Sequence, residues 1–130
     1  MPTKKVSRVT RARFEELVWQ AVESLPAFFK ERLQNVMIVI KDHPDPPDDT
    51  LLGLYHGVPL TERSVFSEQI QPDIIYIFQK NIEALANGND DEIRRQLRTT
   101  VMHEIGHYFG LDEDQLAALE DEPDAAPPLL

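Results

Sequence analysis

The stretch TTVMHEIGHYFGLDEDQL, residues 99–116, contains two histidines four positions apart, with Glu104 directly after the first. Apolar residues recur every three to four positions through the preceding sequence, which predicts one long amphipathic helix. Its stripe consists of Ile93, Leu97, Val101, Ile105 and Tyr108 or Phe109. Asn89 and Glu92 form a capping-box pattern at the start, and Gly110 stands where a left-handed residue would end the helix.

The two histidines lie on one face of this helix, because positions i and i+4 are neighbours on a helical surface. His103 and His107 can therefore direct their imidazoles at a common point, and neutral imidazole nitrogen is a zinc ligand. Glu104 is rotated by about 100° from His103, too far to join them as a ligand. It can still act on water as a general base, the role of glutamate in H-E-x-x-H sequences.

A third ligand is expected after the glycine, where the chain can turn back toward the histidines. Glu113 stands ten residues after His103. This is the spacing at which H-E-x-x-H-x-x-G-x-x-H proteins place their third histidine. Two histidines and one carboxylate are a known zinc combination. The sequence thus predicts Zn²⁺ at His103, His107 and Glu113.

The other elements follow from hydrophobic periodicity and from the positions of proline and glycine. A helix is expected over 10–25 with Thr10 as its N-cap, followed by a short helical piece from Pro26 and a buried strand over 35–42. A proline-rich loop over 43–50 leads to an edge strand over 51–60, which is interrupted by Gly53, and a further strand is expected over 73–80. A helical turn or two over 81–87 is closed by Gly88, and a last helix is expected over 112–120. This order predicts an α+β fold with helices against a small mixed sheet.

The chain of 130 residues is expected to form one domain, with a basic arm over residues 1–9 and a flexible proline-rich tail over 122–130. A net charge of −10 argues against nucleic acid as a partner. The chain has no apolar run of membrane-spanning length and no secretory signal, and it lacks cysteine. We therefore expect a cytoplasmic protein without a membrane partner, and its oligomeric state stays open.

Three segments resemble the minimal zincin-like metallopeptidases: RFEELVWQAVESLP (13–26), LLGLYHGVPLTERS (51–64) and RRQLRTTVMHEIGHYFGLDEDQL (94–116). The resemblance implies a zincin fold reduced to its N-terminal half, in which a small mixed sheet packs against an N-terminal helix and a metal-site helix. It also implies zinc at the two histidines and the acid at position 113, with Glu104 as catalytic base. The family usually has aspartate as the third ligand, so Asp112 and Asp114 remain alternatives to Glu113.

Two functions fit these features. One is a zinc-dependent metallopeptidase, and the other is a zinc-binding protein of little or no activity that holds a peptide or regulates a partner. Either would bind a peptide or protein along an edge strand, for which LLGLYHG (51–57) is the candidate. Peptide deformylase also uses H-E-x-x-H but needs a cysteine ligand, which this chain lacks. Further hydrogen-bond donors are sought among Tyr55, His56 and Tyr76, whereas Arg63 and Ser64 are expected to have a cap or turn role.

Overall fold

The computed structural model describes residues 9–33, 35–59 and 72–121. Within these ranges the elements are α1 (Arg11–Glu23), α2 (Ala27–Lys30), β1 (Val36–Lys41), β2 (Gly53–His56), β3 (Asp73–Phe78), α3 (Gln79–Ala86), α4 (Asp90–Tyr108) and α5 (Glu113–Asp121). The predicted arm and tail lie outside the described residues, apart from Val9. Arg63 and Ser64 lie outside them as well.

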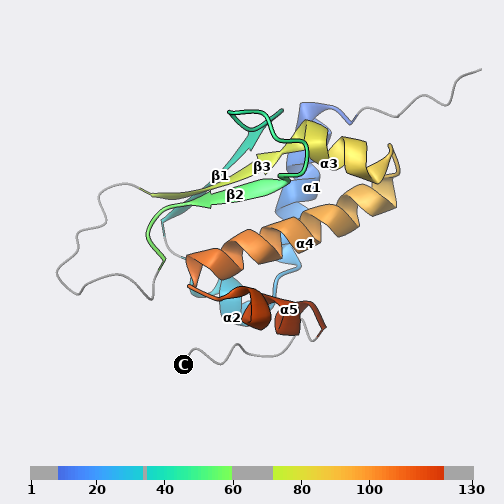
Figure 1. The fold of residues 1–130 in the computed structure, drawn as a ribbon. Coiled ribbons are helices and arrows are strands. Elements are labelled where there is room, and N and C mark those ends of the chain that lie inside the picture. The colour runs from blue at the N-terminus through green and yellow to red at the C-terminus, as the bar shows by residue number, and fades with distance from the viewer. Residues whose placement is uncertain (1–8, 34, 60–71, 122–130) are drawn as a thin grey trace, which may run out of the picture.

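The described strands form a mixed sheet in the order β1-β3-β2 (Figure 1). β1 runs parallel to β3, with Val36 opposite Asp73, and β2 runs antiparallel to β3, with Tyr55 opposite Ile75. β2 therefore lies at an edge of this sheet, as the sequence predicts. The mixed sheet and its helices confirm the α+β prediction.

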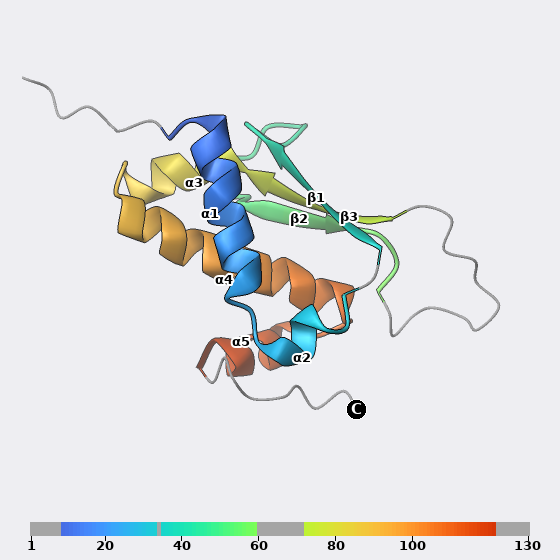
Figure 2. The same ribbon diagram turned by 180° about the vertical axis from the view of Figure 1, so that it is seen from behind.

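Helices α1 and α4 cross on one side of the sheet (Figure 2). The core lies between these two helices and the sheet. It contains Ile75 and Ile77 of β3, both without solvent exposure. The predicted stripe of α4, from Ile93 to Tyr108, is buried there in full. Burial of each large apolar side chain contributes about 1.5–3 kcal/mol, so this stripe fixes how α4 is rotated against the sheet.

The helix starts follow the sequence closely. Thr10 accepts a hydrogen bond from the backbone N–H of Arg13 at 3.1 Å, and Asn89 accepts one from that of Glu92 at 3.0 Å. The capping box also predicts a reciprocal bond from the Asn89 N–H to the Glu92 carboxylate, and this prediction is wrong. The Glu92 carboxylate binds the side chains of Arg95 and Gln96 on the next turn instead of returning to Asn89.

The predicted strand ends need correction. The 51–60 strand begins only at Gly53, because the Asn81 amide holds the Leu51 carbonyl in the preceding loop at 2.7 Å. The 73–80 strand ends at Phe78, and α3 starts directly with Gln79. The 35–42 strand covers Val36–Lys41, and it is half-buried rather than buried because it forms the other edge of the sheet.

The predicted helix ends shift by smaller amounts. α1 covers less than 10–25, and the piece after Pro26 is a single turn. The 81–87 helix begins earlier and ends at a left-handed Asn87 ahead of Gly88. The last helix begins at Glu113, because Asp112 serves as its cap. No helix in the described part of the chain is long and apolar enough to cross a membrane.

Candidate metal centre

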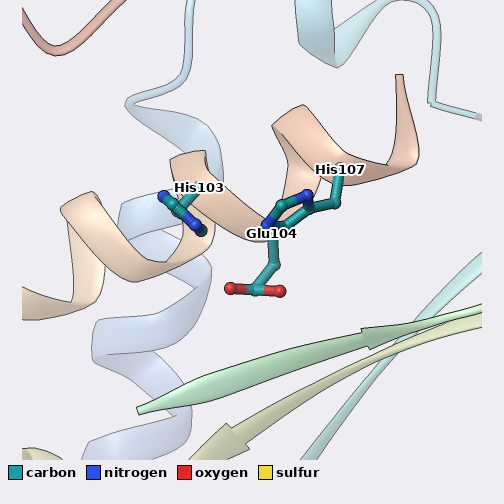
Figure 3. Close-up of side chains that lie close together, drawn as sticks. All are labelled: His103, Glu104 and His107. Carbon is teal, nitrogen blue, oxygen red and sulfur yellow. The ribbon is translucent and has the colours of Figure 1, made fainter. Parts of the chain in front are cut away.

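The two histidines lie one turn apart near the end of α4 and share a face (Figure 3). The centroids of their rings are 4.7 Å apart. Their side chains are 30% and 35% exposed, so both border the core without entering it. One ligand atom from each of His103, Glu104 and His107 falls within 4.8 Å of the others, a cluster that could hold a metal ion.

Glu104 points from α4 toward the edge strand β2 (Figure 3). Its Oε1 accepts a hydrogen bond from the backbone N–H of Tyr55 at 2.8 Å, and its side chain is buried. Burial raises the pKa of the Glu104 carboxyl, and this outweighs the lowering effects of His107, His103 and the Tyr55 N–H. Helix α4 and strand β2 therefore hold between them a buried carboxyl group whose pKa is raised, and this group lies beside two imidazoles.

A tight turn follows α4 and sets the direction of the next segment. Gly110 adopts a left-handed conformation with φ of 81°. Its N–H donates to the His107 carbonyl at 2.9 Å, and the Leu111 N–H donates to the Gly106 carbonyl at 3.0 Å. These two bonds constitute a Schellman motif, for which glycine is the preferred residue. The predicted bend at Gly110 is confirmed.

The next helix begins immediately after this turn with a reciprocal cap. The Asp112 carboxylate accepts from the Gln115 N–H at 2.8 Å, while the Gln115 side chain accepts from the Asp112 N–H at 2.9 Å. The Asp112 carboxylate is thereby directed to the start of α5. Glu113, the first residue of α5, has Oε1 at 3.6 Å from His103 Nε2 and 3.8 Å from His107 Nε2. For Asp114, no comparable contact with either imidazole is found within the described residues.

His103, Glu104 and His107 line a cleft of about 530 Å³. Both histidines and Glu104 form one side, together with the turn at Gly110 and Leu111, and the other side is the segment from Leu51 to Pro59. The lining beyond the site itself is largely apolar, with Leu51, Leu54 and Leu111. The cleft thus runs between the metal-site helix and an edge strand.

The three candidate hydrogen-bond donors, Tyr55, His56 and Tyr76, lie in different places relative to the cleft. Tyr55 lines the cleft, but its contribution toward the site is the backbone N–H that binds Glu104. Alternation along β2 and β3 places His56 and Tyr76 on the opposite face of the sheet. Tyr76 there stacks on Phe78 and lies beneath the Lys41 ammonium, 5.1 Å from the ring centroid. Neither belongs to the cleft lining.

Two contacts at the site escaped the sequence analysis. One is the bond from Tyr55 to Glu104, and the other is the bond from the Tyr55 hydroxyl to the buried Asp73 at 2.7 Å. The available signal is weak: two glycines flank Tyr55 at positions 53 and 57, a pattern that permits close backbone packing. Asp73 carries no signal of its own at the start of an apolar strand.

A small mixed sheet with a histidine-glutamate-histidine helix beside its antiparallel edge strand defines a minimal zincin-like fold. The family model for zincin-like metallopeptidases matches residues 33–122. The chain belongs to this family, and the resemblance noted in its sequence is confirmed. A comparison with curated proteins finds no match.

Proposed function

We propose that the protein is a zinc-dependent peptide hydrolase in which His103, His107 and Glu113 hold the metal and Glu104 is the general base. One observation carries the assignment of the ligands: Glu113 Oε1 lies 3.6 and 3.8 Å from the two Nε2 atoms. Tetrahedral zinc with bonds of 2.0–2.2 Å separates its ligand atoms by about 3.3–3.6 Å. The two separations between the Glu113 carboxylate and the imidazoles are therefore close to those between ligands of one zinc ion.

Glu104 is also close to both histidines, but it is the weaker candidate for a ligand. Its Oε1 is already bound by the Tyr55 N–H, and its carboxylate extends toward β2. Glu113, by contrast, is the first residue of α5, whose start is capped by Asp112, and its Oε1 lies near both imidazoles. These contacts support a division of labour in which Glu113 binds metal and Glu104 moves protons.

Zinc at this position would act as a Lewis acid toward a peptide carbonyl and lower the pKa of water. Glu104 would take a proton from water on a carboxylate oxygen while the water oxygen attacks the carbonyl carbon. It would then deliver that proton to the leaving nitrogen as the C–N bond breaks. A carboxyl with a raised pKa suits both steps, because it holds the transferred proton more readily than an exposed glutamate.

We further propose that the peptide lies along β2 in an extended conformation. β2 forms one wall of the cleft, and strand addition uses main-chain hydrogen bonds at a sheet edge. The other edge of the described sheet is less suitable. The Arg11 guanidinium from α1 donates to the Ile40 carbonyl of β1 at 3.0 Å, and β1 lies on the far side of β3 from the cleft.

The alternative of a zinc-containing binding protein also has support in the cleft. Within the described residues its lining comes from two segments only, 51–59 and 103–111. A groove with so few walls favours capture of an extended peptide over tight enclosure of a reacting bond. This alternative predicts the same ligands, so the two functions differ in turnover alone.

Substitution of Glu104→Gln separates them. We expect zinc content to remain near that of the parent, and cleavage of a peptide library by the zinc-loaded protein to fall by about 10²–10⁴-fold, since general acid–base catalysis contributes that much. Glu113→Gln is the matched variant. It should lower the affinity for zinc in addition to the rate of cleavage. If peptides bind the parent and Glu104→Gln equally and neither protein cleaves them, the hydrolase is contradicted and the protein acts as a zinc-containing binding protein.

A further inference from the structure

One residue of the edge strand, Tyr55, makes three contacts around the candidate base, one through its backbone and two through its side chain. The Tyr55 N–H donates to Glu104 at 2.8 Å, and the Tyr55 hydroxyl donates to Asp73 Oδ2 at 2.7 Å. The Tyr55 ring also packs edge-on against Tyr108, with centroids 6.2 Å apart. The same residue thereby connects Asp73 at the start of β3 with two positions of α4, Glu104 and Tyr108.

Asp73 is a fixed anchor for that connection. Its side chain is 2% exposed, and a buried carboxylate is tolerated where hydrogen bonds compensate its lost hydration. Its backbone N–H donates to the Asn35 carbonyl at 3.0 Å, and the register pairs it with Val36 of β1. The position of the carboxylate is therefore set by the central strand of the sheet.

The backbone directly after β2 packs tightly against Tyr55 and Asp73. A Cβ atom added to Gly57 would lie 2.6 Å from Asp73 Cγ and Oδ1 and 2.7 Å from the Tyr55 hydroxyl oxygen. Such distances are too short for any side chain. The segment after β2 therefore closes over the hydroxyl–carboxylate bond, which leaves Tyr55 little room to move relative to Asp73.

We propose that Tyr55 is a positioning residue for Glu104, and that its hydroxyl bond to Asp73 fixes the backbone N–H that orients the carboxylate. β2 has only four residues, so its ladder to β3 alone gives it a limited hold. The terminal torsion of glutamate is broad, and a fixed donor to one oxygen narrows it. The inference rests on the proposed function and adds to it the device that aims the base.

The experiment compares the zinc-loaded full-length parent with Tyr55→Phe, with Asp73→Asn and with Tyr76→Phe as the matched control. Tyr76 lies in the same sheet but on the opposite face, so its hydroxyl should not matter. The first readout is the ¹⁵N–¹H signal and hydrogen-exchange rate of the residue 55 amide. Glu104→Gln supplies the reference for how that amide responds when its acceptor changes.

We expect Tyr55→Phe to shift the residue 55 amide signal and to speed its exchange, with zinc content unchanged. Peptide cleavage should show kcat reduced by about 10- to 100-fold at nearly constant KM, as expected for a misplaced catalytic group. Asp73→Asn keeps an oxygen acceptor for the hydroxyl, so it should retain most of the parent's values. Tyr76→Phe should match the parent in every measurement.

An unchanged residue 55 amide in Tyr55→Phe would overturn the positioning role, as would equal effects from Tyr55→Phe and Tyr76→Phe. If Tyr55→Phe fails to fold, Asp73→Ala decides, because it removes the acceptor of the Tyr55 hydroxyl. Faster exchange of the residue 55 amide and a lower kcat than in Asp73→Asn support the inference, and parent-like values contradict it. Absence of cleavage by the parent would instead contradict the proposed hydrolase, and the amide measurements would still test the contact with Glu104.

Discussion

Gly53 of β2 packs closely against α4. A Cβ atom at this position would be 2.7 Å from Thr100 Cγ2, 3.0 Å from the Tyr76 carbonyl oxygen and 3.3 Å from Glu104 Cγ. The bond from the Tyr55 N–H to Glu104 therefore depends on a residue without a side chain two positions earlier. Because of this close packing, β2 and α4 together hold the side chain of Glu104, the candidate base.

We predict that Gly53→Ala lowers the free energy of unfolding by about 1–3 kcal/mol, the usual cost of overpacking. Thr100→Ser removes the methyl group nearest to the new Cβ. Added to Gly53→Ala, it should recover part of the loss, whereas alone in the parent it should destabilise. Denaturant unfolding of the four proteins measures this coupling. Simple additivity of the two changes would show that the methyl contact is not the cause.

At the scale of residues, sequence reasoning succeeds where the partners are close along the chain. His103, Glu104 and His107 belong to one helix, and Glu113 begins the next helix after a short turn, so local geometry brings these residues near one another. The tie from Tyr55 to Glu104 spans 49 residues, and no local rule specifies such a contact. It depends on the register of β2 against β3, which is set only in the folded sheet.

At the scale of elements, the position of Glu113 depends on how α5 begins. Asp112 and Gln115 cap each other there. We predict that Asp112→Ala weakens zinc binding although Asp112 is not a proposed ligand. Loss of an N-cap costs about 0.5–2 kcal/mol and frays the first turn, which contains Glu113. A competition titration with a zinc chelator measures the affinity.

Asp112→Asn is the matched control, because asparagine is an equally good N-cap. It should bind zinc about as tightly as the parent, while Asp112→Ala should also show faster hydrogen exchange in α5. Strong loss of affinity in Asp112→Asn would indicate that the Asp112 charge itself holds the metal, and Asp112 would then replace Glu113 as the third ligand.

The first turn of α4 has its own dependence on pH. Hydrogen bonds from the Arg95 and Gln96 side chains lower the pKa of Glu92 from 4.5 to about 2. A carboxyl with a lowered folded-state pKa adds stability that is complete above its unfolded pKa and is lost as the pH falls toward 2. We predict that stability falls more between pH 6 and pH 2 in the parent than in Glu92→Gln.

Thermal unfolding across that range tests the prediction, and 1 M salt should reduce the difference, because the Glu92–Arg95 pair is exposed to solvent. Parallel pH profiles for the two proteins would contradict it.

The ends of elements are harder to predict than their presence, for reasons that these residues make visible. Gln79 and Lys80 follow the apolar run of β3 with no glycine or proline between, yet the chain starts α3 there. Asn81 of that helix binds the carbonyls of Asp48 and Leu51, and so fixes a loop 30 or more residues earlier. Such long-range bonds decide where β2 begins and β3 ends. They cannot be predicted from the periodicity of apolar residues along the sequence.

At the scale of the molecule, the candidate metal site joins α4, α5 and the sheet. A ligand that binds only the folded state stabilises it, by about 2.7 kcal/mol when free zinc is at 100 times its Kd. We predict a corresponding rise in Tm of the parent with zinc, reversed by a chelator. His103→Ala with His107→Ala should abolish the rise. An equal rise in that double variant would place zinc binding elsewhere on the chain.

The family and the fold class were predictable from the sequence because they depend on patterns, namely the spacing of the metal-site helix and the alternation of helices and strands. The cytoplasmic location and the single-domain organisation stay predictions. The arrangement of the cleft was not predictable, since it arises from the packing of segments 51–59 and 103–111 against each other.

The tie between Tyr55 and Glu104 makes strand slippage a matter of chemistry as well as stability. Successive amides of a strand alternate in direction, so a shift of β2 by one residue against β3 would turn the Tyr55 amide away from α4 and send its ring to the opposite face. The slipped protein would keep both histidines and Glu113 on their helices. Under the proposed function it would still bind zinc, but Glu104, the proposed base, would lose the N–H that orients its carboxylate.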